Sequence, residues 1–166
     1  MYPYASADPV GFVDPSGLWG FGALGSASAE AGNAALGVGA TGALGGGVFV
    51  GPDGVTVGGF ASAGGFVGGL AVPTVSFPST TQPSFAIGGF GGGGGGAFLT
   101  NASCAENLQG PFTTYSLNLG LGFGEVSIQF GLSENGTFIA SLTGGPVGLG
   151  LSLSGFPTTA AGKTAF

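Results

Sequence analysis

The sequence predicts a mainly β protein in which an antiparallel meander closes into a small barrel or sandwich. Large apolar residues alternate with small or polar ones through the last third of the chain, the period of a strand with one apolar face. Compact turn sequences, such as Gly51-Pro52-Asp53-Gly54, separate the alternating segments. The chain also has 40 glycines among 166 residues, and each glycine costs a helix about 1 kcal/mol relative to alanine.

The composition changes twice along the chain and divides it into residues 1–20, residues 21–47 and a glycine-rich β domain, residues 48–166. In the first part, Asp14-Pro15-Ser16-Gly17 predicts a turn. The second part is a Gly/Ala-rich leader with two interpretations. It forms one short helix over Ser26–Leu36, with a serine at its start and Gly37 beyond its end, or it is a flexible linker.

The first half of the β domain predicts one hairpin, followed by two breaks. Val48–Val50 and Val55–Phe60 flank the Gly51–Gly54 turn and are expected to pair. Prolines 73, 78 and 83 make residues 71–84 a connection or an edge strand, because proline cannot donate to a central ladder. The six consecutive glycines at 91–96 predict a loop after a strand at 85–90.

The last third predicts an antiparallel meander of four strands. The strands are expected at residues 115–123, 126–132, 138–142 and 147–153, with turns at Glu134-Asn135-Gly136 and Gly144-Gly145-Pro146. Closing this sheet is expected to bury its apolar side and to remove its edges.

The alternation defines an apolar stripe, but not the side of the sheet on which the stripe lies. Its members are Leu117, Leu119, Ile128, Phe130, Leu149 and Leu151. If they point into a closed interior, the domain is soluble; if they point outward in a continuous band, it inserts into lipid. The few charges and the strand lengths, close to those that cross a bilayer, support the second arrangement.

The charge composition excludes several classes of function. Seven acidic residues stand against a single cation, Lys163, with no arginine and no histidine, for a net charge of −6. Nucleic-acid binding depends on Lys and Arg, so no nucleic-acid partner is expected. Histidine is the usual general acid–base group and the commonest metal ligand, and one cysteine cannot build a disulfide or a zinc site. We therefore expect no cofactor, no metal and no evident catalytic residue.

The most polar stretch of the domain, residues 100–112, holds the one candidate nucleophile, Cys104. Glu106 lies two residues further on and is the candidate acid partner. A thiol is activated by a base or a nearby positive charge, whereas an adjacent carboxylate opposes formation of the thiolate. We interpret this stretch as a structured loop with a small, half-buried cysteine.

Three other patterns do not predict a site. Gly162-Lys163-Thr164 lacks the earlier glycine and the following helix of a phosphate-binding loop. Asn101-Ala-Ser and Asn135-Gly-Thr match the N-glycosylation pattern by chance. The carboxylates are scattered and are expected to be solvated turn residues rather than an acid–base pair: Glu30, Asp53, Glu106, Glu125 and Glu134.

Residues 1–20 contain a further motif, made by Tyr2, Tyr4, Pro9, Val10, Phe12, Val13, Asp14, Pro15, Ser16, Gly17, Leu18 and Trp19. This run resembles the end of the core of Rhs/YD-repeat proteins, Y-x-Y-x-x-x-x-P-V-x-F-V-D-P-S-G-L-W. Ala7-Asp8 stands where members of the family usually have Asn-Asn. The T-N-A at Thr100 and the L-x-G-P-F at Leu108 are also similar to glycine-rich C-terminal regions of Rhs-like proteins.

The resemblance implies that residues 1–20 are the junction between a large β shell and a variable C-terminal cargo, often a toxin. In the family the shell cleaves itself after the leucine, which implies cleavage after Leu18 with Asp14 taking part. From the residues alone, Asp14 is expected only to cap a turn.

Two non-enzymatic functions follow as expectations, beside an enzyme that acts through a carboxylate or serine without histidine. The first is a non-enzymatic, membrane-acting cargo region of an Rhs-like polymorphic toxin, with membrane lipid as its partner. The second is a soluble structural or interaction module that binds a protein partner, the Rhs shell or an immunity protein. The resemblance implies a secreted or cell-surface location, as part of a larger exported bacterial protein. No secretory signal is expected in this chain, because its N-terminus has no basic region followed by an apolar stretch.

Overall fold

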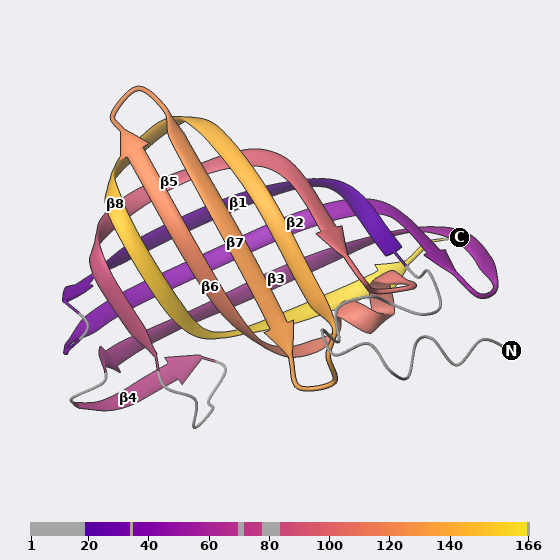
Figure 1. Ribbon diagram of the computed structural model, residues 1–166, viewed down its shortest axis with the longest axis horizontal. Coiled ribbons are helices and arrows are strands. Elements are labelled where there is room, and N and C mark those ends of the chain that lie inside the picture. Colours follow the sequence, from indigo (N-terminus) through magenta and orange to yellow (C-terminus); the bar gives the residue numbers. More distant parts are fainter. Residues whose placement is uncertain (1–18, 34, 70–71, 78–83, 166) are drawn as a thin grey trace, which may run out of the picture.

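A computed structural model describes residues 19–33, 35–69, 72–77 and 84–165, and nearly all of them lie in one antiparallel sheet (Figure 1). The strands are β1 (Trp19–Asn33), β2 (Gly37–Gly51), β3 (Gly54–Gly69), β4 (Val72–Phe77), β5 (Phe85–Thr100), β6 (Gly110–Leu121), β7 (Glu125–Ser133) and β8 (Phe138–Thr164). A short 3₁₀ helix, η2 (Ala105–Leu108), precedes β6. The expected fold class, mainly β with an antiparallel barrel-like or sandwich-like sheet, is confirmed.

The sheet curls and closes on itself through the pairing of β3 with β8. Its strand order is β4-β3-β2-β1-β5-β8-β6-β7, and β8 pairs in addition with β3 and β7. The long β8 makes this possible, because residues 139–155 pair with β5 and residues 158–164 pair with β3. In Figure 1, β6 and β7 cross in front of β1, β2 and β3, so the closed sheet has an inside and an outside.

Most of the described residues between 21 and 47 are strand, which corrects both interpretations of the leader. Apart from the bend at Ala35 and Leu36, they belong to β1 and β2, which pair with each other along their length. β1 also pairs along its length with β5 on its other side. Glycine has low intrinsic propensity for strand as well as helix, so the two ladders, rather than local preference, set this structure.

The six-glycine run is also strand rather than the expected loop. Gly91–Gly96 lie in the middle of β5, between β1 and β8. An added Cβ at Gly94 would overlap the backbone of Gly144, and one at Gly96 would overlap the carbonyl of Leu142. The run therefore lets three backbones approach more closely than side chains would permit.

Of the expected turns, two are confirmed and one is wrong. Gly51 pairs with Gly54 across the first hairpin, and Gly136 has a positive φ of 84° in the β7–β8 turn. At Gly144-Gly145-Pro146, however, β8 continues, so the last two expected strands are one. The register against β5 shifts there, between Gly93 and Gly95, which indicates a bulge. A bulge accommodates Pro146, which lacks the N–H that a regular ladder requires.

The proline-rich segment at 71–84 contributes an edge, one of its two expected forms. β4 lies at the end of the strand order and pairs with residues 65–69 of β3. Residues 58–64 of β3 pair with β8 instead. β4 thus continues the pairing of β3 beyond the point where β8 leaves it.

Candidate functional site: an apolar outer band around a polar interior

The apolar stripe of the last three strands points outward. Leu149 is 72% exposed, Leu151 59% and Ile128 52%; Leu117, Leu119 and Phe130 are exposed as well. The residues that alternate with them point inward and are buried, including Ser116, Asn118, Ser127, Ser152 and Ser154. The expectation that closure would bury the apolar side is therefore wrong for this part of the sheet.

Room inside the closed sheet explains this orientation. An eight-stranded sheet encloses a space just wide enough for side chains, and here the backbones of neighbouring strands approach closely at glycines such as Gly94 and Gly120. Serine, asparagine and glycine occupy this part of the space, and the leucines of the opposite face lie outside it. Closure thus directs the bulky residues outward.

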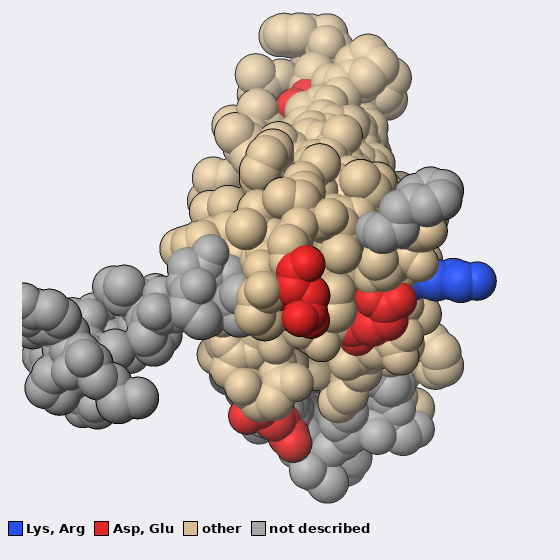
Figure 2. Space-filling view, turned by 90° about the vertical axis from the view of Figure 1, so that its right-hand side faces the viewer, with Lys and Arg blue, Asp and Glu red and all other residues tan. Residues whose placement is uncertain are grey.

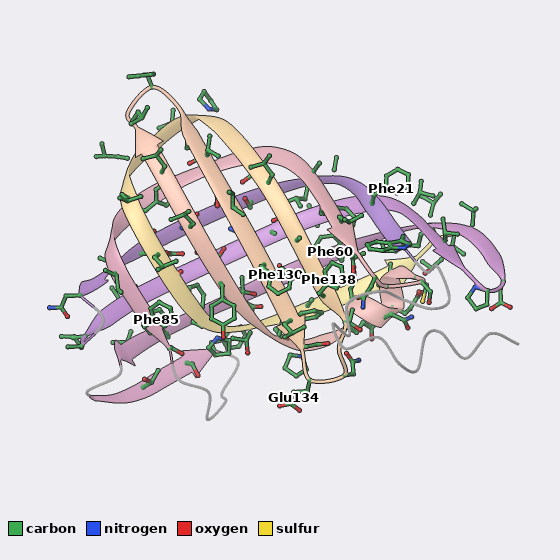
Figure 3. The ribbon with its side chains drawn as sticks, in the orientation of Figure 1. Phe21, Phe60, Phe85, Phe130, Glu134 and Phe138 are labelled. Atoms are coloured by element: carbon green, nitrogen blue, oxygen red, sulfur yellow. The ribbon has the colours of Figure 1, made fainter. Side chains whose placement is uncertain are left out.

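Together, the outward-facing apolar side chains form a band, here called the outer band, to which every strand contributes. Its large members are Phe21, Val38, Leu44, Val50, Val55, Val57, Val67, Val75, Phe77, Ile87, Leu99, Tyr115, Leu117, Leu119, Leu121, Val126, Ile128, Phe130, Leu132, Leu142, Val147, Leu149, Leu151 and Leu153. Among the exposed strand residues that the structure describes, the only polar side chains are Asn33 and Lys163, each near a strand end. In Figure 3, Phe21 points away from the ribbon.

Inside the sheet, a polar network surrounds the buried carboxylate of Glu30. Ser116 donates to Oε1 at 2.9 Å, while Ser152 and Asn118 donate to Oε2 at 2.9 and 3.3 Å. Ser116 also contacts Ser154 at 2.7 Å, and Ser127 donates to the side-chain oxygen of Asn118. These six residues, from β1, β6, β7 and β8, form the inner polar network. Its hydrogen bonds offset the cost of burying these polar side chains.

A second carboxylate, Glu125, is buried at the start of β7. It is 7% exposed, and it accepts a hydrogen bond from the backbone N–H of Gly93. Its Oε2 has no hydrogen-bond partner, and an added Cβ at Gly92 or Gly148 would overlap it. Glycines therefore make the space that this carboxyl group occupies.

A different interior lies at the end of the sheet where η2 packs. Leu108 and Ala105 of η2 are buried against a cluster of large apolar residues: Leu24, Phe49, Phe60, Phe98 and Phe112. Phe60 and Phe98 meet edge to face, with ring centroids 5.1 Å apart. This apolar cluster closes the interior at one end, as a conventional core does.

The two ends of the closed sheet also differ in charge. Four exposed charged residues lie at one end, here called the charged end: Asp53 in the β2–β3 turn, Glu106 in η2, Glu134 in the β7–β8 turn and Lys163 near the end of β8. Figure 2 faces this end and shows acidic groups and the lysine on it, and Figure 3 labels Glu134 at its turn.

The opposite end, here called the hydrophobic end, comprises β4, the β1–β2 turn (residues 33–37) and the β6–β7 turn (residues 121–125). Among its described residues, Leu36 is 59% exposed and Phe123 82%, and Asn33 is the exposed polar side chain. Glu125, in the β6–β7 turn of this end, is buried.

Between the two kinds of interior there is little empty space. A cavity of about 40 Å³ is lined by Phe60 and Phe112 of the apolar cluster and by polar residues such as Thr114 and Gln129. A space of that size holds a few water molecules at most. This cavity is therefore too small to form an open channel.

The Cys104–Glu106 pair forms a structural contact. Glu106 accepts hydrogen bonds from the hydroxyl and from the backbone N–H of Thr164, the latter at 2.6 Å. These bonds, with the Thr164 hydroxyl first, lower the pKa of Glu106 from 4.5 to about 2. A carboxylate so acidic is a poor base for activating the half-buried Cys104. Glu106 therefore has a structural role: its hydrogen bonds to Thr164 hold η2 against the end of β8.

The two asparagines of the glycosylation patterns are also structural. Asn101 donates to the carbonyl of Gly136 at 3.1 Å and accepts from the N–H of Phe138 at 2.8 Å. Asn135 accepts from the N–H of Thr137 inside the same turn. They fasten the end of β5 to the β7–β8 turn.

The remaining sequence candidates are not brought together. Lys163 and Thr164 lie in β8, not in a phosphate-binding loop. Asp53 and Glu134 are exposed in turns, as expected, whereas Glu30 and Glu125 are buried, which the sequence did not indicate. Asp14 and Leu18, tied by resemblance to self-cleavage, lie outside the described residues.

No three His, Cys, Asp or Glu side chains of the described residues lie close enough together to hold a metal ion. No helix in the described part of the chain is long and apolar enough to span a membrane. Comparison of the chain with protein-family models, with curated proteins and with solved structures found no match.

Proposed function

We propose that this chain is a non-enzymatic module that inserts into lipid, with its outer band in the hydrocarbon and its inner polar network shielded from it. The observation that carries the proposal is the outward direction of the apolar stripe, from Leu117 to Leu151, over a polar interior. A protein in water has the opposite arrangement.

The backbone supports the same proposal. In hydrocarbon every N–H and C=O must be satisfied within the protein, which a sheet can achieve only by pairing its edges. Here β3 pairs with β8, so the central strands have partners on both sides. Strands of about 9–11 tilted residues cross a bilayer, and all but the short β4 reach that length.

The resemblance of residues 1–20 to the end of an Rhs core supplies a setting for this activity. In that setting the chain is the C-terminal cargo region of an Rhs-like toxin, exported with its shell, and the membrane of a target cell is its partner.

The test is flotation of the full chain with phosphatidylcholine vesicles in a density gradient, followed by a wash at high salt and high pH. We chose a zwitterionic lipid because an anionic surface would repel a chain of charge −6. The chain is expected to float and to resist the wash. Leu149→Asp, which places a charge in the outer band, is expected to reduce the floated fraction by about tenfold or more.

The matched control is Ala165→Asp, which adds the same charge beyond β8 at the charged end and should float like the unsubstituted chain. Circular dichroism establishes that each variant folds. If the unsubstituted chain stays monodisperse in the buffer layer, lipid insertion is wrong, and the soluble interaction module becomes the working function.

A further inference from the structure

The outer surface of the closed sheet is asymmetric along its axis. All four exposed charged residues of the described chain lie at the charged end. At the hydrophobic end, the two tight turns present Leu36 and Phe123. A charge is costly to carry across hydrocarbon and an apolar turn is not, so the two ends are not equally able to cross a bilayer.

Apolar residues occupy part of the interior at both ends, since Phe66, Ala86 and Phe156 form a buried cluster beside Gly37 of the β1–β2 turn. Inside the charged end lies the apolar cluster with η2, which is the arrangement of a protein surrounded by water. Toward the hydrophobic end lies the inner polar network, with Glu30, Asn118 and Ser152 buried behind an apolar exterior. That inverted arrangement suits surroundings of lipid.

The connectivity agrees with the asymmetry of the outer surface. β1 begins and β8 ends at the charged end, since Trp19 pairs with Val50 beside the β2–β3 turn and Thr164 bonds to Glu106 of η2. Trp19 therefore lies at the charged end. Among the described residues, β4 and the turns that carry Leu36 and Phe123 are the parts that have to cross.

We propose, on the basis of the lipid-inserting function, that the closed sheet enters a bilayer with its hydrophobic end first. The turns at Leu36 and Phe123 reach the far side, while Asp53, Glu106, Glu134 and Lys163 stay in the water on the side from which the protein came. Every molecule inserted from one side then has the same orientation.

The experiment uses two cysteine variants of the full chain in the same Cys104→Ser background, Asp53→Cys at the charged end and Phe123→Cys at the hydrophobic end. Each is added to the outside of phosphatidylcholine vesicles, and the floated vesicles are treated with a membrane-impermeant maleimide. Asp53→Cys is expected to react fully. Phe123→Cys is expected to react only after the vesicles are opened with detergent.

Other labelling patterns would contradict the proposed orientation but not the proposed insertion into lipid. Equal partial labelling of both variants means that the sheet inserts in either direction, and labelling of Phe123→Cys alone means that it inserts the other way. Full labelling of both, on chains that float and resist the wash, means that the hydrophobic end does not cross. If neither variant floats, the lipid-inserting function has failed and the orientation falls with it.

A second pair tests the reason for the orientation. Phe123→Lys places a charge on the leading turn and is expected to lower the floated fraction about tenfold or more. Asp53→Lys, at the charged end, is expected to leave it unchanged. Equal loss in both variants, or in neither, contradicts a leading hydrophobic end.

Discussion

At Glu30, one buried carboxylate accepts hydrogen bonds from the side chains of Ser116, Asn118 and Ser152, on two strands other than its own. No described Lys or Arg side chain lies in this network, so its stability rests on these donors. The carboxylate consequently holds β1, β6 and β8 in a fixed relation.

Glu30→Ala is expected to destabilise the folded state, because each buried donor left without an acceptor costs about 1–3 kcal/mol. The free energy of unfolding in urea, followed by the fluorescence of Trp19 in lipid or micelles, measures the effect. Glu134→Ala, in an exposed turn, is the control and should change it by less than about 0.5 kcal/mol. Equal effects of the two substitutions would show that the network contributes no stability.

Glycines within one run differ in what they do. An added Cβ at Gly94 overlaps the backbone of Gly144, whereas at Gly91 it meets no atom within 4 Å, and neither residue has a positive φ. The run thus contains positions where contact between backbones demands glycine, and positions where it does not.

We expect Gly94→Ala to lower the free energy of unfolding by about 1–3 kcal/mol, because the strands must move apart. Gly91→Ala should be neutral or stabilising by up to about 1 kcal/mol, since alanine restricts the unfolded chain. The urea concentrations at the midpoint of unfolding, compared for the two variants and the unsubstituted chain, measure these effects. A larger loss at Gly91 than at Gly94 would contradict the close approach of β5 and β8.

At the scale of elements, η2 is fastened to the end of β8 by Glu106. The Thr164 hydroxyl and N–H hold the pKa of this carboxyl down, from 4.5 to about 2. Because the folded-state pKa is the lower one, the stabilisation is fully present above the unfolded value of 4.5 and is lost as the pH falls toward 2.

Glu106→Gln should therefore melt below the unsubstituted chain at pH 6, and the difference in Tm should shrink between pH 4.5 and pH 2. Thermal melts followed by near-ultraviolet circular dichroism over that range provide the measurement. A Tm difference that is independent of pH would mean that the charge of Glu106 does not matter. Glu134→Gln, in an exposed turn, controls for the general effect of removing one negative charge.

At the scale of the whole molecule, the closed interior predicts that the chain inserts into lipid without making the vesicles leak. The cavity inside the sheet is about 40 Å³, and the apolar cluster with Leu108 closes the charged end. Vesicles carrying the inserted chain should therefore retain an entrapped fluorescent dye, with detergent lysis giving full release as the reference. Release that rises in proportion to the floated protein would show that the interior opens in lipid.

Several elements were predictable because their signals are local. The Gly51–Gly54 turn, the Glu134–Gly136 turn and the alternation from Tyr115 onward each depend on neighbouring residues, and the structure confirms them. Residues 21–47 and the glycines at 91–96 were misjudged because their strands are held by ladders to partners distant in sequence. The site escaped prediction for the same reason, since Glu30 meets Asn118 across 88 positions.

The sequence by itself determined that this protein is mainly β, that its strands have one bulky apolar face and one small polar face, and that charge is nearly absent from them. The tertiary structure alone decided which face lies outside. A period of two is the same for either orientation, and the side is set by how tightly the sheet closes. Where the neighbouring strands β5 and β8 meet at Gly94 and Gly144, their backbones leave no room for a Cβ, and in the last strands small and polar residues occupy the inside while the leucines lie outside.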